Sequence, residues 1–189
     1  MSQPAITTGL DGINASGNVP TWIIQDATVT TPLVEGTESI DGALFTAAET
    51  VKIDCYHNMG DVAFTRTPTT RERKRACEKV TVTRKTGETI EGTIQAIYDQ
   101  QAAAEATINA AYSALPEGAT VYVAIGYGHD SHDGLPARVD IYRGDVSMRS
   151  KNQPVEGEDL MFTSTISADL FLEDVTVTGD VSDGGGSGE

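Results

Sequence analysis

The 189-residue chain has few cysteines, no long apolar run and no targeting segment. Its two cysteines, Cys55 and Cys77, are too few for a disulfide framework and lack metal-ligand spacing, so we expect two reduced, structural thiols. No stretch approaches the roughly 18 apolar residues that a membrane span requires. Residues 1–18 lack the basic start and apolar core of a signal peptide. The sequence therefore predicts a soluble protein, made in the cytoplasm, with no membrane partner.

Basic residues are also scarce. Thirteen Lys and Arg face 28 Asp and Glu, and the formal charge of −15 argues against a phosphate-binding surface as the main feature of the protein. The charge is unevenly spread, with −7 over residues 1–61, +1 over 62–151 and −9 over 152–189. This polarity suits self-association, in which an acidic face of one copy meets the basic segment of the next. A solvated acidic tail is the alternative.

Motifs of catalysis and cofactor binding are missing. The chain has no G-x-S-x-G, P-loop or HExxH, and no G-x-G-x-x-G that opens a helix. We therefore expect neither an enzyme nor a cofactor. The densest group of potential ligands is "GHDSHDG", with His129, Asp130, His132 and Asp133, which we interpret as a hairpin loop. A metal site is the alternative, because His and carboxylate suit several divalent cations.

Alternating patterns dominate what is present. In "DLMFTSTISADLFLED" (159–174) one parity is apolar apart from Ser164, namely Leu160, Phe162, Ile166, Ala168, Leu170 and Leu172. The other parity carries hydroxyls and carboxylates: Thr163, Thr165, Ser167, Asp169 and Glu173. The pattern predicts a long strand with one buried face and one polar face.

A second segment repeats this Thr-rich face. "EKVTVTRKTGETIEGTIQAI" (78–97) contains two alternating runs about a Thr-Gly pair, which predicts a β-hairpin. One parity holds Val80, Val82, Ile90 and Ile94, and the other holds Thr81, Thr83, Thr89, Glu91, Thr93 and Gln95.

The remaining patterns predict a mainly β domain over residues 21–178. Further strands are expected at 21–30, 61–68, 119–128, 137–150 and 175–179, with one Ala-rich helix at about 98–115. We expect an N-terminal arm over 1–20, a long loop over about 32–60, and a flexible acidic, Gly-rich tail over 179–189. The fold class is an antiparallel β-sandwich or barrel-like domain with one flanking helix.

One basic segment, "TTRERKRACE" (69–78), stands out in the acidic chain. It carries Arg71, Arg73, Lys74 and Arg75, interrupted by Glu72. We interpret it as a protein–protein contact, with a solvated segment or an anion site as the alternatives.

Together these segments resemble the tail tube (major tail) proteins of long-tailed, siphovirus-like phages that infect actinobacteria. The resemblance covers about residues 20–178 and lies in "LPEGATVYVAIGYG" and "RVDIYRGDVSMRSKNQPVEGEDLMFTSTIS". The Pro154-anchored acidic turn that leads into the Ser/Thr strand carries the most weight.

The resemblance implies a structural virion protein with the tail-tube β-sandwich and a flanking helix. Such proteins form hexameric rings that stack into a tube, through which the genome leaves the capsid. It further implies a tape measure protein inside the tube, tail terminator and distal tail proteins at its ends, and transient, non-specific passage of double-stranded DNA. The arm 1–20, the loop 32–60 and the segment Arg71–Arg75, with Trp22, would make contacts between subunits. The protein would be made in the bacterial host cytoplasm and reside in the virion tail.

A DNA channel gives the polar faces a physical role. DNA carries one charge per roughly 1.7 Å, so Lys or Arg along the wall would slow its movement, whereas hydroxyls and carboxylates would not. We therefore predict that the lumen is lined by Thr81, Thr83, Glu91, Thr93, Gln95, Thr163, Thr165, Ser167 and Asp169. The alternatives are a surface- or carbohydrate-binding module, the inner tube of a contractile injection apparatus, and a small metal-dependent enzyme at His129 and His132.

Overall fold

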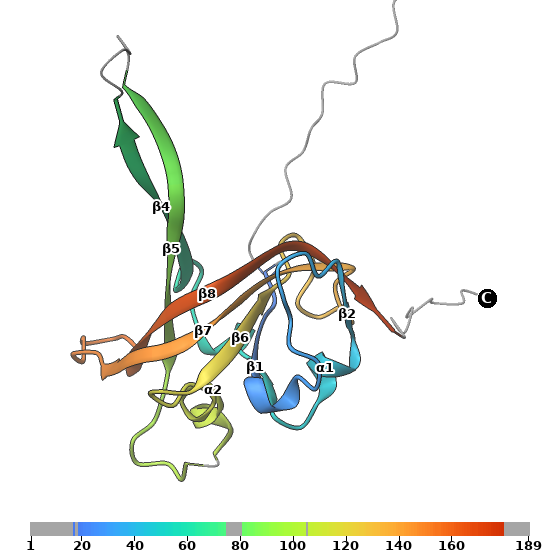
Figure 1. The fold of residues 1–189 in the computed structure, drawn as a ribbon. Coiled ribbons are helices and arrows are strands. Elements are labelled where there is room, and N and C mark those ends of the chain that lie inside the picture. Colours follow the sequence, from blue (N-terminus) through green and yellow to red (C-terminus); the bar gives the residue numbers. More distant parts are fainter. Residues whose placement is uncertain (1–16, 18, 75–80, 105, 180–189) are drawn as a thin grey trace, which may run out of the picture.

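The computed structural model describes residues 17, 19–74, 81–104 and 106–179 (Figure 1). Seven strands follow one another in a single sheet in the order β3-β1-β6-β7-β8-β5-β4, and β2 pairs with β8. The strands are β1 Thr21–Gln25, β2 Ser39–Asp41, β3 Thr50–Lys52, β4 Val62–Arg73, β5 Val82–Ile97, β6 Thr120–Ile125, β7 Arg138–Lys151 and β8 Met161–Thr178. All pairs are antiparallel except β2 with β8. The helices are α1 Ala43–Thr46 and α2 Ala110–Ala114, with 3-10 turns at Asp26–Thr28, Asp54–Tyr56 and Thr107–Asn109.

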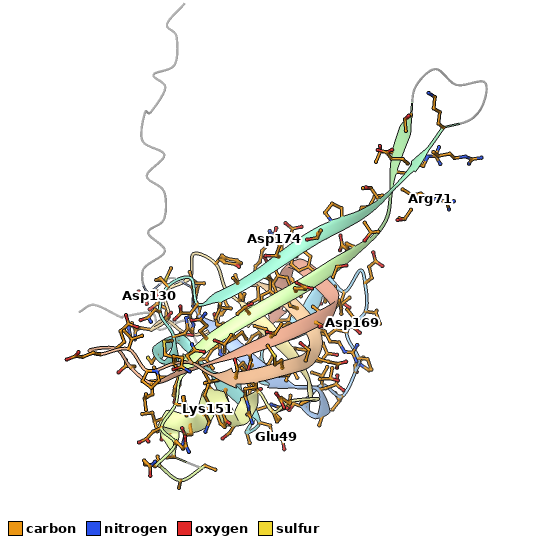
Figure 2. All side chains as sticks on the ribbon, turned by 90° about the vertical axis from the view of Figure 1, so that its left-hand side faces the viewer. Glu49, Arg71, Asp130, Lys151, Asp169 and Asp174 are labelled. Carbon is orange, nitrogen blue, oxygen red and sulfur yellow. The ribbon has the colours of Figure 1, made fainter. Side chains whose placement is uncertain are left out.

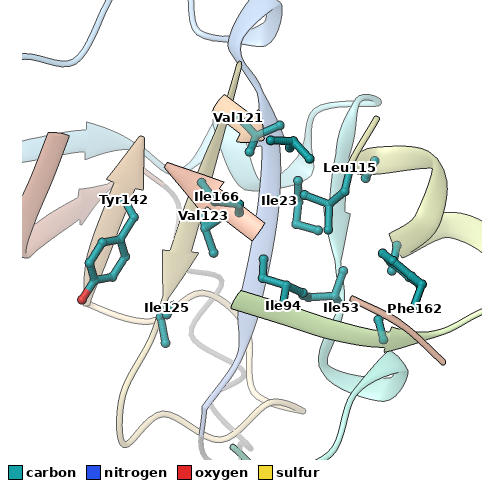
Figure 3. Close-up of a cluster of buried hydrophobic side chains, with 14 of the residues drawn as sticks. Ile23, Ile53, Ile94, Leu115, Val121, Val123, Ile125, Tyr142, Phe162 and Ile166 are labelled. Atoms are coloured by element: carbon teal, nitrogen blue, oxygen red, sulfur yellow. The ribbon is translucent and has the colours of Figure 1, made fainter. Parts of the chain in front are cut away.

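The predicted fold class, mainly β and antiparallel with a flanking helix, is confirmed. The inner face of the sheet closes on itself, because Ile94 of β5 packs in one cluster with Ile23 of β1 and Val123 of β6 (Figure 3). Leu115, which follows α2, closes the same cluster. This curl lets one continuous sheet enclose a core as the two sheets of a sandwich would.

The outer face of the sheet is buried at one end only. Residues 26–50, here called the cover, lie over this end and include β2 and α1 (Figure 1). Phe45 of the cover meets Trp22 of β1 edge to face, with ring centroids 5.0 Å apart, and the cluster extends to Leu172 of β8. The loop predicted over about 32–60 therefore contains regular elements that cover apolar surface.

Strand β8 changes the side on which it buries apolar residues. Phe162 and Ile166 belong to the inner cluster, whereas Leu172 belongs to the outer one. The expectation that all the apolar residues of one parity share a face is therefore wrong. The register against β7 shifts between Arg143 and Gly144 and leaves Asp169 as an extra residue. Such a bulge reverses the alternation of a strand, which a period-2 count along the sequence cannot include.

The hairpin predicted within residues 78–97 is also wrong. Residues 82–97 form one strand, β5, which pairs with β4 rather than with itself. The pairing passes from Thr69 with Gly87 to Thr70 with Lys85, so Thr86 is an extra residue. The Thr-Gly pair thus lies at a β-bulge and not at a turn. The sequence did not separate the two, because an isolated Gly in a strand pattern fits either.

The predicted helix over about 98–115 shortens to α2, Ala110–Ala114, preceded by a 3-10 turn. The buried Asn109 side chain holds the preceding segment in a loop: its Nδ2 donates to the carbonyl oxygens of Asp99 and Ala103, and its Oδ1 accepts from the amide of Asp99. Ile108, within this 3-10 turn, is 40% exposed. The Ala-rich stretch offers little side-chain area to bury, so propensity alone does not hold it helical.

Strands β4 and β5 continue beyond the body as a two-stranded arm, residues 67–74 and 81–89 (Figures 1 and 2). An aromatic stack holds its base: Phe64 of β4 lies 3.9 Å from Tyr142 of β7, ring centroid to centroid, and Tyr142 lies 4.7 Å from Phe171 of β8. Burial raises the pKa of Tyr142 to about 12. A Cβ on Gly92 would fall 2.2 Å from the Phe64 ring, so Gly92 makes room for the stack.

Candidate functional site

The uncovered end of the outer face is formed by β5, β8 and β7, whose outward side chains are polar apart from the exposed Met148. Each residue of β8 has one neighbour on β5 and one on β7: Ser167 lies between Glu91 and Asp145, and Thr165 lies between Thr93 and Met148. Thr163 lies in the same way between Gln95 and Ser150. These nine residues are here called the open face. None of them is fully buried, and none is basic.

Six of the predicted lumen residues belong to this open face, so the sequence placed them on one side correctly. They are Glu91, Thr93, Gln95, Thr163, Thr165 and Ser167. The sequence prediction missed the contribution of β7, which adds Asp145, Met148 and Ser150. The alternation in "RGDVSMRSK" indicated a polar face there, but the register shift between Val146 and Met148 changes the parity within it.

Hydrogen bonds tie the polar side chains to their neighbours. Thr120 Oγ1 donates to Asp145 Oδ1 at 2.6 Å, and Thr163 Oγ1 donates to Asn152 Oδ1 at 2.7 Å. Ser147 Oγ donates to the carbonyl oxygen of Thr165 at 3.1 Å. In these three contacts the hydroxyl proton is donated to an acceptor within the protein.

Two basic residues of β7, Arg149 and Lys151, point to the side of the sheet opposite to the open face. Arg149 Nη1 donates to the carbonyl oxygens of Tyr112 and Leu115, at 2.8 and 3.2 Å, and its guanidinium lies 3.8 Å from the Tyr112 ring centroid. Lys151 Nζ donates to Gln100 Oε1 at 3.0 Å and lies 5.3 Å from the Tyr98 ring centroid. These two cations therefore pack around α2 and the loop before it, away from the open face.

Arg143 marks the border between the open face and the covered end. Its Nη1 lies 2.7 Å from Asp169 Oδ2, and its Nε lies 3.5 Å from Asp26 Oδ1 at the start of the cover. Partial burial acts to lower the pKa of Arg143, but Asp169 leads the groups that raise it overall. Asp169, predicted to line the lumen, is thus an ion-paired bulge residue at the edge of the open face.

Two other predicted lumen residues do not join this surface. The bulge at Thr86 places Thr83 opposite Glu72, on the face of the ribbon that Ile90 occupies and not on the face of Glu91. Thr81 lies just before β5, at the far end of the arm. The grouping of both with Glu91 is therefore a second consequence of counting parity through a bulge.

Most of the predicted inter-subunit residues lie on the arm, but Trp22 does not. Arg71, Arg73 and Lys74 are exposed there, while Arg75 falls outside the described residues. Trp22 is only 3% exposed, packed against Phe45 with Lys52 Nζ 5.4 Å from its ring centroid. The prediction that Trp22 contacts another subunit is therefore wrong for this conformation, because the cover occupies its surface.

The His and Asp residues of 128–134 lie in the loop between β6 and β7. His129 Nε2 contacts the carbonyl oxygens of Asp133 and Gly134, and the amide of His132 donates to Asp130 Oδ1. In the described part of the chain, no group of three or more His, Cys, Asp or Glu is arranged to hold a metal ion. No helix among the described residues is both long and apolar enough to cross a membrane.

Comparison with known proteins connects this geometry to a family. A family model described as "Phage tail tube protein" matches residues 11–179. No curated protein matches the sequence. Among solved structures, the chain is similar to a chain of the cryo-EM structure of the anti-feeding prophage baseplate, six-fold symmetrised, with 10% identity, coverage of 91% of this chain and 96% of the other, and a TM-score of 0.46. Because the family model spans nearly the whole described domain, this chain belongs to the phage tail tube protein family.

Proposed function

We propose that the chain polymerises as stacked hexameric rings into a phage tail tube, and that the open face lines the channel through which the genome is ejected. Membership of the family already makes it a structural protein of the phage tail. The observation that carries the finer proposal is the sidedness of β7: its exposed polar residues face outward, while Arg149 and Lys151 are turned to the opposite side.

This sidedness suits a wall past which DNA must move. A cation on the wall would form contacts with phosphates, and each contact would have to break as the duplex advances. Hydroxyls held by neighbouring groups and carboxylates such as Glu91 and Asp145 do not attract the backbone. The open face therefore supports transient passage of double-stranded DNA without retention.

The two ends of the sheet supply a means of ring closure. Among the described strands, β4 and β3 are the outermost strands of the path, so each has one edge that pairs with no other described strand. An exposed edge pairs readily with another chain. Repeated edge pairing around an axis would join the open faces of all copies into one wall.

The proposal includes the partners that a tail tube requires. A tape measure protein would occupy the lumen before DNA does, and tail terminator and distal tail proteins would bind the two ends of the tube. The protein would be made in the host cytoplasm and would act in the virion tail. We also propose a long-tailed, siphovirus-like phage of an actinobacterium as the source of the tube.

Negative-stain microscopy of the purified protein tests polymerisation, with rings or tubes as the expected result. The channel role is tested by Thr165→Lys, placed on the open face, against Gln101→Lys, which makes the same charge change on an exposed loop residue elsewhere. Phage carrying Thr165→Lys should assemble tails but release DNA more slowly, as followed with a DNA-binding dye. Normal release by Thr165→Lys, or equal slowing by both variants, would contradict the channel role.

A further inference from the structure

Strand β8 has two partners on one edge and a gap between them. β5 pairs with it up to Ala168, and β2 pairs with it from Thr176 onward. Because β7 pairs with both of these residues on the opposite edge, β5 and β2 share the other one. No described strand pairs with residues 169–175 on that shared edge, where β5 leaves β8 toward the arm (Figure 1; Figure 2 labels Asp169 and Asp174 within the gap). An unpaired edge of this kind accepts an extended segment through main-chain hydrogen bonds.

A hollow lies along this gap. It has a volume of about 390 Å³ and lies between residues 36–38 of the cover, Arg138 of β7 and residues 171–174 of β8. Arg66 of β4 stacks on the Phe171 ring, with its guanidinium carbon 4.3 Å from the ring centroid, so a cation already packs beside the gap. The hollow provides room for the side chains of an added strand.

The hollow is acidic. Three exposed carboxylates line it, those of Glu38, Glu173 and Asp174, against one base, Arg138. Asp140 lies close by, because its Oδ1 accepts a hydrogen bond from the amide of Asp174 at 2.9 Å. Burial raises the pKa of Asp140, this hydrogen bond acts to lower it, and the charges of Asp174 and Glu173 raise it further. A cation relieves such crowding of like charges, so the hollow favours a segment that carries Lys or Arg.

Most basic residues of this chain lie on strands that already have partners. Residues 1–51 and 152–189 contain no Lys or Arg, so these segments supply no basic strand. Seven of the thirteen Lys and Arg lie within residues 71–85, where the described strands of the arm pair with each other. The other six lie on β3, β4 and β7, each of which pairs with another described strand. The acidic body of a second copy would meet the acids of the hollow with like charge, so a different protein is the better matched occupant.

We propose that the β8 edge between β5 and β2, residues 169–175, binds an extended, basic segment of another protein of the tail by strand addition, with Lys or Arg side chains directed to Glu38 and Glu173. Main-chain hydrogen bonds hold any extended segment, and the alternate side chains select a basic one. The site requires only the fold of one chain, so it does not rest on the proposed ring or channel. Added salt weakens the charge contribution, because it shortens the screening length.

A model peptide tests the preference for positive charge. The probe is a dye-labelled peptide that alternates lysine with valine, and its binding is followed by fluorescence anisotropy. We expect Glu38→Lys/Glu173→Lys to weaken binding about tenfold or more. Glu156→Lys/Glu158→Lys makes the same charge change in the exposed loop between β7 and β8 and should stay within about twofold of the parent protein. The fluorescence of Trp22 should be unchanged, since all four side chains are exposed, and equal loss in both variants, or loss in neither, would overturn the proposal.

Backbone methylation of the same peptide tests main-chain pairing. Alternate amides of a strand point to opposite edges, so peptides methylated at one alternate set or the other differ in the edge that can donate hydrogen bonds. We expect one methylated peptide to lose binding and the other to retain it. The retained peptide should protect amides of residues 169–175 from hydrogen exchange. Equal binding of the two methylated peptides would overturn strand addition.

A second copy is the competing occupant of the gap. It would be indicated if Glu38→Lys/Glu173→Lys loses polymer in sedimentation, or if the peptide inhibits polymerisation, and either result would overturn the assignment to another protein. We expect the variant to polymerise as the parent protein does. Absence of polymer from the parent protein would remove the proposed tube, whereas peptide binding by the same sample would still support the strand-addition site.

Discussion

The two ends of the outer sheet face share strands β7 and β8 but have opposite chemistry. At one end the cover lies over β1, β6, β7 and β8 and buries Trp22, Tyr122 and Leu172. At the other end the same side of β7 and β8 carries Asp145, Thr165 and Ser167 in contact with solvent. The outward residues of a strand segment are therefore apolar where the cover lies over that segment and polar where it does not.

The bulge at Asp169 allows one strand to serve both ends. Before it, the apolar residues of β8 face the inner cluster and the hydroxyls face outward. After it, Leu172 faces outward and meets the cover. A regular strand would have placed either apolar residues on the open face or polar residues beneath the cover.

The largest contrast should come from truncating one side chain at each end. Phe45→Ala removes a ring that is 6% exposed beneath the cover and should cost about 3–5 kcal/mol of the free energy of unfolding. Thr165→Ala on the open face should change it by no more than about 0.5 kcal/mol. Urea unfolding followed by Trp22 fluorescence measures both. Similar losses would contradict the division of the face into a core and a surface.

The second prediction concerns the bulge itself. A Cβ on Gly144 would lie 2.5 Å from the carbonyl oxygen of Ser167 and 2.6 Å from the Cα of Ala168, both backbone atoms of β8. Gly144→Ala should therefore destabilise the fold by about 1–3 kcal/mol. Gly87→Ala is a control, because its Cβ would meet nothing within 4 Å. Equal thermal stability of the two variants would mean that the bulge does not require glycine.

A smaller effect on stability is expected at Arg143, on the border between the open face and the covered end. Arg143→Met keeps much of the side-chain volume but removes the ion pairs to Asp169 and Asp26. Because both carboxylates are partly exposed, we expect a loss of about 1 kcal/mol or less. The loss should shrink at high salt in urea titrations. A loss that does not depend on salt would show that Arg143 acts by packing on Tyr122 instead.

The smallest effect on stability is expected at Ser164, which lies on the inner side of β8. Ser164 is fully buried, and its hydroxyl has no hydrogen-bond partner among the described residues. Ser164→Ala removes this unsatisfied hydroxyl, so the free energy of unfolding should stay the same or rise by up to about 1 kcal/mol. Thermal unfolding would show a raised or unchanged midpoint. A clear fall would mean that the hydroxyl has a partner, such as a buried water.

Sequence reasoning succeeded where a local pattern was uninterrupted. The alternation of Thr163, Thr165 and Ser167, and that of Glu91, Thr93 and Gln95, correctly placed both sets on one face of their strands. It failed where the chain contains an extra residue, as at Thr86 and Asp169, because a bulge changes parity and no residue type is specific to it: the Gly beside Thr86 also fits a turn. It also failed for Trp22, since burial by the cover depends on residues distant in sequence.

The amino-acid sequence by itself determined the β-rich class, the cation-poor character of the Ser/Thr strands and the concentration of basic residues at 71–85, because each depends only on composition and local period. The tertiary structure decided which half of each strand is covered, that β5 pairs with β4 as one long arm, and that Arg149 and Lys151 turn toward α2. These features depend on long-range register and packing, which residues close together in the chain do not specify.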